Sequence, residues 1–101
     1  MASKIPNDLP IERDEGPGKG RYLLRLDGVE AELTYSRAGE GTIIIDHTEV
    51  PAALRGRSVG QALVRCAVED ARAEGRFIMP LCPFARAQFA RHPEWQDVLK
   101  R

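Results

Sequence analysis

The sequence predicts an α+β fold, built on a twisted mixed sheet of about four strands with one long helix and short C-terminal helices. Two observations support this class. Three segments with strand-like patterns come first, as is typical of an antiparallel meander. A long amphipathic pattern and a short apolar segment follow, and a strand after a crossover helix usually lies parallel to the strand before it.

The first strand should begin at Arg21, where apolar and polar residues start to alternate. Asp27-Gly28 is a hairpin signal, and the alternation resumes over residues 29–36. The third strand runs from Thr42 to about Glu49. Its isoleucine run is apolar on both faces, which favours a central position in the sheet.

The long helix is predicted from about Val59 to Glu74, with Gly75 as its C-terminal cap. Its apolar side carries Val59, Leu63, Val64, Ala67, Val68 and Ala71. A short strand over residues 76–79 follows. Pro83 then begins a short helix that His92-Pro93 ends. Residues 94–99 form a last helical turn, with Trp95 and Leu99 packing back.

The segment before Arg21 has no apolar period and is rich in proline and glycine. We therefore expect a flexible N-terminal arm over residues 1–20 and one domain over residues 21–101. The length of 101 residues, 43% of them hydrophobic, suits a single small core.

The composition also excludes some functions. Lys+Arg and Asp+Glu are both 15, so the formal net charge is zero and no global field favours nucleic acid or an anionic membrane. No apolar run approaches the ~20 residues of a membrane span. Cys66 and Cys82 lack metal-ligand spacing, and no secretory signal is visible. We expect reduced thiols, no metal and a cytoplasmic location.

A basic, glycine-containing loop lies between the third strand and the long helix. The first turn of a helix has free N–H groups, and the helix dipole adds partial positive charge there. Arg55 and Arg57 add full charges, so the loop predicts a local phosphate site. The two arginines could instead be solvated loop charges. Ser58 and Gln61 fit a capping box, which is compatible with such a site if other N–H groups stay free.

This loop resembles motif A of the GNAT acetyltransferases, Arg/Gln-x-x-Gly-x-Gly/Ala. Arg55 and Gly60 occupy the first and last places, while Ser58 stands where the family usually has glycine. The blocks over residues 46–51, 80–85 and 92–95 sharpen the resemblance to minimal, stand-alone GNAT-like proteins. The similarity covers residues 21–99, and it implies an acetyl-CoA-binding mixed sheet with weak or uncertain acetyl transfer to amines.

The resemblance also implies roles for individual residues. The phosphates of coenzyme A would lie against the loop, and main-chain N–H groups near Val50 would hold the pantetheine arm and polarise the acetyl carbonyl. The proposed coenzyme-binding residues are Val50, Arg55, Gly56, Arg57, Ser58, Val59, Gly60 and Gln61.

Cys82 follows a strand and precedes a helix, where a thiolate is favoured. The resemblance places it near the acetyl thioester, although a free cysteine is often only a small buried hydrophobe. His47 and Glu49 alternate with Ile43 and Ile45 on one face of the third strand. Either could act as the general base, or both could belong to a strand end that leaves the core.

Two further residues have simpler interpretations. Cys66 lies on the apolar side of the long helix and should belong to the core, and His92 should cap the end of the short helix. The sequence thus favours an acetyl-CoA-dependent N-acetyltransferase acting on an unidentified amine, with protein amines among the candidates, by direct attack or through Cys82. The alternative is a non-catalytic acyl-CoA-binding or protein-interaction module. Turnover with an amine separates the two.

Overall fold

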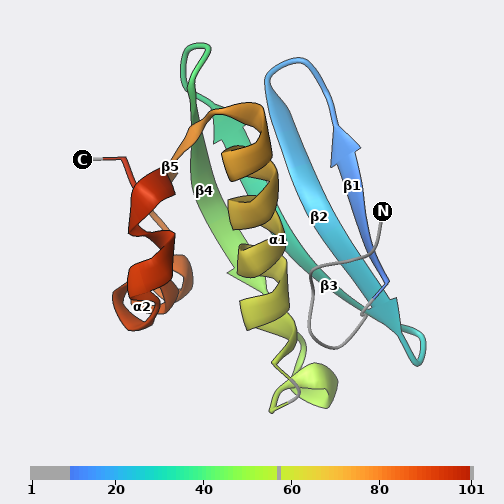
Figure 1. Cartoon of the computed structure of the whole chain (residues 1–101). Helices are drawn as coiled ribbons and strands as arrows, with labels where there is room; N and C mark the ends of the chain where they lie inside the picture. Colours follow the sequence, from blue (N-terminus) through green and yellow to red (C-terminus); the bar gives the residue numbers. More distant parts are fainter. Residues whose placement is uncertain (1–9, 57, 101) are drawn as a thin grey trace.

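The computed structural model describes residues 10–56 and 58–100. Its elements, in chain order, are β1 (Ile11–Glu15), β2 (Lys19–Leu26), β3 (Val29–Arg37), β4 (Thr42–Glu49), the short 3-10 helix η1 (Ala52–Leu54), α1 (Val59–Glu74), β5 (Phe77–Pro80), α2 (Pro83–Arg91) and the 3-10 helix η2 (Pro93–Val98). The strands form one sheet in the order β1-β2-β3-β4-β5. Helix α1 lies along one face of this sheet, and α2 lies beside β5 (Figure 1).

The pairing confirms the predicted mixed sheet. Strands β1 to β4 are antiparallel neighbours, and β5 returns from α1 to pair with β4 in parallel. Asp27 and Gly28 both have positive φ in the two-residue turn between β2 and β3, as their sequence predicts. β4 is flanked by β3 and β5, which explains why its isoleucine run can be apolar on both faces.

Helix α1 spans Val59–Glu74, as predicted, and ends at Gly75 in the left-handed conformation. The six apolar positions that the helical period selected are all buried against the sheet. Trp95 packs edge-on against Phe89, with 5.6 Å between ring centroids, and closes the core at the C-terminal end. None of the helices in residues 10–56 and 58–100 has the length and apolar character needed to cross a bilayer.

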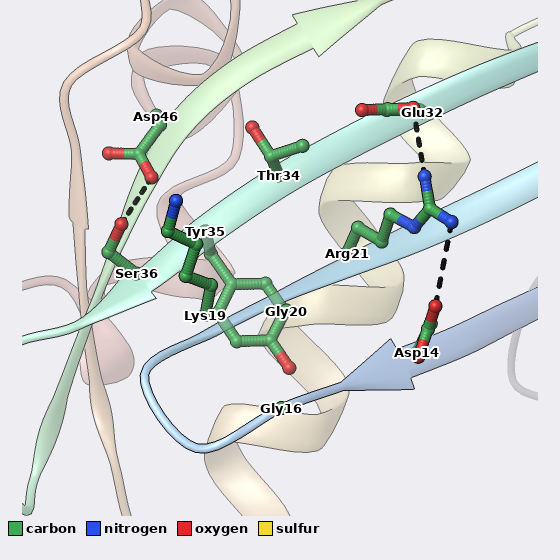
Figure 2. Close-up of a pocket in the computed structure, with 10 residues that line it drawn as sticks. All are labelled: Asp14, Gly16, Lys19, Gly20, Arg21, Glu32, Thr34, Tyr35, Ser36 and Asp46. Carbon is green, nitrogen blue, oxygen red and sulfur yellow. Dashed lines mark hydrogen bonds and ion pairs between the residues drawn. The ribbon is translucent and has the colours of Figure 1, made fainter.

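The sheet face opposite α1, called here the open face, carries polar side chains. Asp14, Arg21, Glu32, Ser36 and Asp46 line a shallow pocket of about 480 Å³ on this face (Figure 2). The Arg21 guanidinium lies 3.5 Å from the Asp14 carboxylate and 3.7 Å from that of Glu32. Ser36 donates to Asp46 at 2.6 Å. Charged groups are therefore already paired within the open face.

The prediction of a flexible arm is wrong for residues 11–20, because β1 and the first residues of β2 are ordered there. Residues 1–9 lie outside the described part of the chain. The strand was hidden because only Ile11 and Arg13 of β1 are half-buried, and every residue of the strand after Ile11 is charged. The partners of Arg13 on β3 and α1 lie far along the chain, where no local period reveals them.

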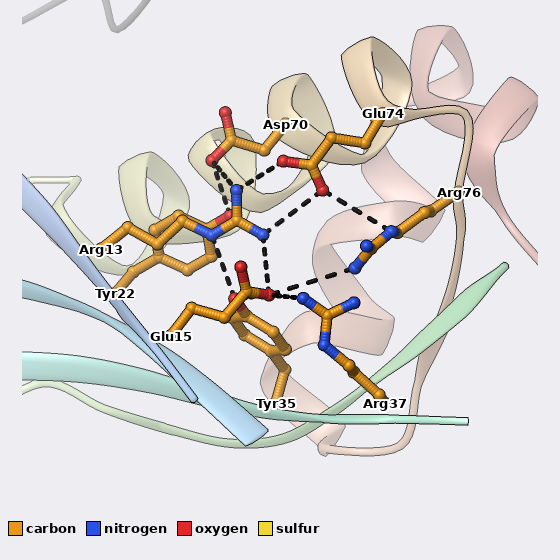
Figure 3. A network of polar contacts seen from close by, with 8 residues as sticks. All are labelled: Arg13, Glu15, Tyr22, Tyr35, Arg37, Asp70, Glu74 and Arg76. Atoms are coloured by element: carbon orange, nitrogen blue, oxygen red, sulfur yellow. Dashed lines mark hydrogen bonds and ion pairs between the residues drawn. The ribbon is translucent and has the colours of Figure 1, made fainter. Parts of the chain in front are cut away.

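Arg13 forms the centre of these long-range contacts, on the helix side of β1 (Figure 3). Its guanidinium donates to Glu74 at 2.6 Å and to Asp70 at 3.2 Å on α1, and its Nε donates to the Tyr35 hydroxyl at 3.0 Å. Burial works to lower the pKa of Arg13, but the hydrogen bonds to Glu74 and Tyr35 raise it overall. Glu15 extends the network by accepting from the Tyr35 hydroxyl.

Candidate functional site

A pocket of about 350 Å³ lies where the C-terminal end of β4, the loop after it, α1 and α2 meet. This is the position that the sequence predicts for a phosphate site. Its lining residues are Thr48, Val50, Leu54, Arg55, Gly56, Ser58, Val59, Gly60, Gln61, Phe84 and Gln88. All of the proposed coenzyme-binding residues line it except Arg57, which lies outside the described residues.

The start of α1 faces this pocket without a side-chain cap. Ser58 occupies the N-cap position, but its side chain makes no capping hydrogen bond, so the predicted capping box with Gln61 does not form. The reason is the backbone of Ser58, which has φ 60° and ψ 25° in the left-handed region, whereas a capping side chain normally needs an extended residue. The first turn also has no acidic residue. The helix dipole and N–H groups are therefore left for an anion.

Arg55 holds the loop against the strand end. Its Nε donates to the Val50 carbonyl at 3.1 Å, which leaves the terminal nitrogens of the guanidinium for other partners. Leu54, only 1% exposed, anchors the same loop in the core. A fixed loop with a cation at the entrance to a helix N-terminus suits a phosphate group.

Gly60 allows the two helices to form the wall of the pocket. A Cβ at this position would lie 2.6 Å from the Cζ atom of Phe84, so no larger residue fits without displacing that ring. Phe84 is 38% exposed and lines the pocket from α2. The motif glycine thus brings the N-terminus of α1 close to α2.

Cys82 lies next to the pocket, although it does not line it. Its Sγ is 3.3 Å from the Thr48 hydroxyl, and Thr48 is a lining residue. The same sulfur accepts the Ala85 N–H and so caps α2, and the residue is 5% exposed. The structure therefore gives Cys82 a packing and capping role, with one hydroxyl between its sulfur and the pocket.

A β-bulge overturns the predicted face of His47 and Glu49. Tyr35 pairs with Ile45 and Thr34 pairs with His47, so Asp46 is an extra residue on β4. The side-chain alternation shifts by one beyond it. Thr48 lies on the helix side with Ile45 and contacts Cys82, while His47 and Glu49 lie on the open face.

His47 and Glu49 are solvent-exposed there. The His47 Nε2 atom lies 3.6 Å from the Glu49 carboxylate, with 63% and 72% of the two side chains exposed. Neither lines the pocket at the start of α1. A base role for either residue requires the acceptor amine to approach from the open face.

Cys66 and His92 have structural roles, as their positions in the sequence predict. Cys66 packs partly buried against the core, and burial, with Asp70 nearby, raises the pKa of its thiol to about 12. His92 is the C-cap of α2, and its ring stacks on Trp95 at 3.9 Å between centroids.

Four lining residues were not predicted from the sequence, namely Thr48, Leu54, Phe84 and Gln88. The spacing of Phe84 and Gln88 placed them on one face of a short helix. Nothing local showed that this face meets the start of α1. Thr48 reaches the helix side only because of the bulge, and the bulge has no sequence signal of its own.

Comparisons with known proteins show which family the chain belongs to. The chain matches the family model of GCN5-related N-acetyltransferases over residues 21–98. It is 34% identical over 67 residues to Protein NATD1 from Danio rerio, covering 64% of this chain and 59% of that protein. It is 32% identical over 76 residues to Protein NATD1 from Gallus gallus, covering 68% and 69%. The chain thus spans 59% of the length of the Danio rerio relative.

Two solved structures are similar. An NMR solution structure of a GCN5-like protein from Staphylococcus aureus superposes with a TM-score of 0.71 at 33% identity, covering 92% of this chain and 89% of that one. The IAA acetyltransferase from Bacillus cereus has a TM-score of 0.58 at 22% identity, covers 75% of this chain and 53% of that one, and supports the fold alone. With the motif A loop, the mixed sheet and the family match in agreement, this chain belongs to the GCN5-related N-acetyltransferase family.

Proposed function

We propose that the chain is an acetyl-CoA-dependent N-acetyltransferase that holds its acetyl donor in the pocket at the start of α1. The observation that carries this proposal is the uncapped helix N-terminus beside Arg55. The N–H groups of Val59, Gly60 and Gln61 and the Arg55 guanidinium would hold the pyrophosphate. The family generally uses acetyl-CoA, and these residues fit its anionic part.

The acetyl end would lie toward Thr48 and Cys82. Pairing between β4 and β5 ends at Ile45 and Pro80, and the chain then turns into α2 while β4 continues to Glu49. The strand edge beyond Ile45 can therefore offer main-chain groups to the amides of the pantetheine arm and to the acetyl carbonyl.

The reaction would transfer acetyl from sulfur to nitrogen. The amine nitrogen forms a bond to the acetyl carbon, the bond from that carbon to sulfur breaks, and coenzyme A leaves as the thiol. The amine loses a proton, and His47 or Glu49 would accept it from an amine that enters over the open face. In the second route Cys82 Sγ takes the acetyl group first and passes it to the amine.

One observation favours a non-catalytic binding module instead. None of the described lining residues of the pocket carries a carboxylate or an imidazole. A binding module would retain coenzyme A and release no thiol when amines are added. Measuring thiol release with small amines, polyamines and lysine peptides separates the two functions.

Calorimetry with coenzyme A tests the binding step. Charge-assisted hydrogen bonds to phosphate contribute ~1.5–3 kcal/mol, so Arg55→Ala should weaken binding by about tenfold or more. Arg25→Ala is the matched control, because it removes the same charge from a side chain that is 65% exposed on β2 and away from the pocket. Equal affinity of the Arg55→Ala and wild-type proteins would rule out the proposed phosphate site.

Cys82→Ser separates the two chemical routes. If Cys82 carries the acetyl group, the variant binds coenzyme A and releases no thiol with any amine, and mass spectrometry finds an acetylated cysteine only in the wild type. If the amine attacks directly, the variant keeps its turnover and loses some thermal stability, because a smaller and more polar hydroxyl replaces a sulfur that is packed in the core.

A further inference from the structure

The open face of the sheet carries more negative than positive charge. Among the residues that the structure describes, its strands provide six carboxylates and three cationic side chains, a formal charge of −3 with His47 neutral. The carboxylates belong to Glu12, Asp14, Glu30, Glu32, Asp46 and Glu49, and the cations are Lys19, Arg21 and Arg25. The whole chain has a formal net charge of zero, so the excess is a local property of this face.

Ion pairs within the open face do not cancel this charge. The Arg21 guanidinium lies between two carboxylates, and that of Arg25 lies between Glu30 at 3.1 Å and Glu12 at 4.0 Å. Each arginine therefore neutralises only one of its two partners. An excess of exposed carboxylates attracts a cationic ligand.

Three of the carboxylates form a row across the sheet, called here the carboxylate row, which begins at a candidate base. Glu49 on β4 is directly opposite Glu32 on β3. Glu32 is opposite Leu23 on β2, and Leu23 is opposite Glu12 on β1. Opposite residues share a face, and like charges in such positions are unfavourable unless a cation lies between them. The row thus leads from the place where an acceptor amine would enter toward the far edge of the sheet.

The dimensions of the open face favour a peptide over a small amine. Neighbouring strands lie ~4.8 Å apart, so the carboxylate row extends roughly 14 Å from Glu49 to Glu12. Figure 2 shows no helix of the described chain in front of the shallow pocket on this face, which leaves room for a chain segment. An extended chain advances ~3.3 Å per residue and crosses this distance in about four residues.

We propose that the open face binds a basic segment of a protein acceptor, with the target lysine at Glu49 and flanking cationic residues along the carboxylate row. This inference rests on the proposed acetyl transfer and specifies the class of acceptor. The start of α1 holds the anionic coenzyme, whereas the open face holds the cationic acceptor. Opposite charges on the two ligands are thus matched by different parts of the protein.

Two synthetic peptides with blocked ends and a single lysine test this surface. The first has arginines about four residues away on each side of the lysine, and the second has glutamines there. In assays with acetyl-CoA, kcat/KM for thiol release should be about three- to tenfold higher with the arginine peptide. Direct binding of fluorescent copies should follow the same order. The difference should shrink as salt is raised, because exposed charge pairs are screened.

A protein that combines Glu12→Gln with Glu32→Gln removes two carboxylates of the row and keeps Glu49. We expect the advantage of the arginine peptide to fall to within about twofold of the glutamine peptide. Glu69→Gln is the matched control, because it removes the same charge from α1 on the other face, and it should keep the full preference. Glu12→Gln alone, at a side chain that is 70% exposed, repeats the test if the double variant is poorly folded.

Three results would overturn the inference. The first is equal binding and turnover of the two peptides by the wild type. The second is an arginine preference that the double variant keeps, or that Glu69→Gln lowers equally, since net charge would then be the cause. The third is a higher kcat/KM for spermidine than for the arginine peptide, which would indicate a small acceptor. Failure of the proposed function looks different, because the wild type would then bind the arginine peptide through the row and release no thiol with any amine.

Discussion

Substitutions of Ser58 test what the start of α1 requires of this position. Its φ of 60° is left-handed, which costs ~1–2 kcal/mol for a residue with a Cβ and little for glycine. Glycine also makes the unfolded chain more flexible, which cancels ~0.5–1 kcal/mol of the stability gained by relieving this strain. We therefore expect Ser58→Gly to stabilise the fold by ~0.5–1 kcal/mol, a rise in melting temperature of about 2–8 °C.

Ser58→Ala separates backbone strain from capping. The Ser58 side chain makes no capping bond, so its removal should change stability by less than ~0.5 kcal/mol. A capping hydroxyl would give the opposite pattern, with a loss of ~0.5–2 kcal/mol for alanine and a small loss for glycine. The two explanations thus differ in the sign of the glycine effect.

Urea and thermal unfolding of both variants provide the measurement. Asp27→Gly is the control, because Asp27 has a similar φ of 54° in the β2–β3 turn. Aspartate tolerates this region better than serine, so the control should gain less. Coenzyme A affinity should be retained in Ser58→Gly, since the backbone N–H groups are unchanged. A destabilised Ser58→Ala variant together with no gain from Ser58→Gly would refute this reasoning.

Two further predictions concern the packing around β1. In Gly20→Ala the new Cβ would lie 2.4 Å from the ring of Tyr35, which is 1% exposed and bonded through its hydroxyl to Arg13. We therefore expect the free energy of unfolding to fall by ~1–3 kcal/mol and the melting temperature to fall by about 5–20 °C. An unchanged melting temperature would contradict the tight contact. The hydrogen bond from Arg13 lowers the pKa of Glu74, so the ionised carboxylate stabilises the fold above its unfolded pKa of ~4.3 and this contribution is lost as pH falls through the folded value. Glu74→Gln should therefore be less stable than wild type near neutral pH, with the difference shrinking as the pH falls below the unfolded pKa of ~4.3. A difference that persists undiminished in acid would show that the ion pair is not its source.

Local patterns alone were sufficient for much of this fold. The boundaries of α1, the Asp27-Gly28 turn and the parallel return to β4 follow from hydrophobic period and turn chemistry, which act within a few residues of each other. The loop at the start of α1 was also recognisable, because a phosphate site of this kind needs one contiguous stretch of strand end, basic loop and helix start.

Other features depend on contacts between distant parts of the chain. β1 is held by the bonds of Arg13 to Glu74, residues 61 positions apart, and its own sequence is too polar to predict a strand. The bulge at Asp46 moved His47 and Glu49 to the open face, because one extra residue reverses every later side chain. Phe84 and Gln88 join the pocket only because α2 packs against the start of α1. The sequence by itself determined the local conformations of this chain. Tertiary packing decided which side chains share the site, because burial and strand pairing bring together residues that are too far apart in the sequence for any local pattern to connect them.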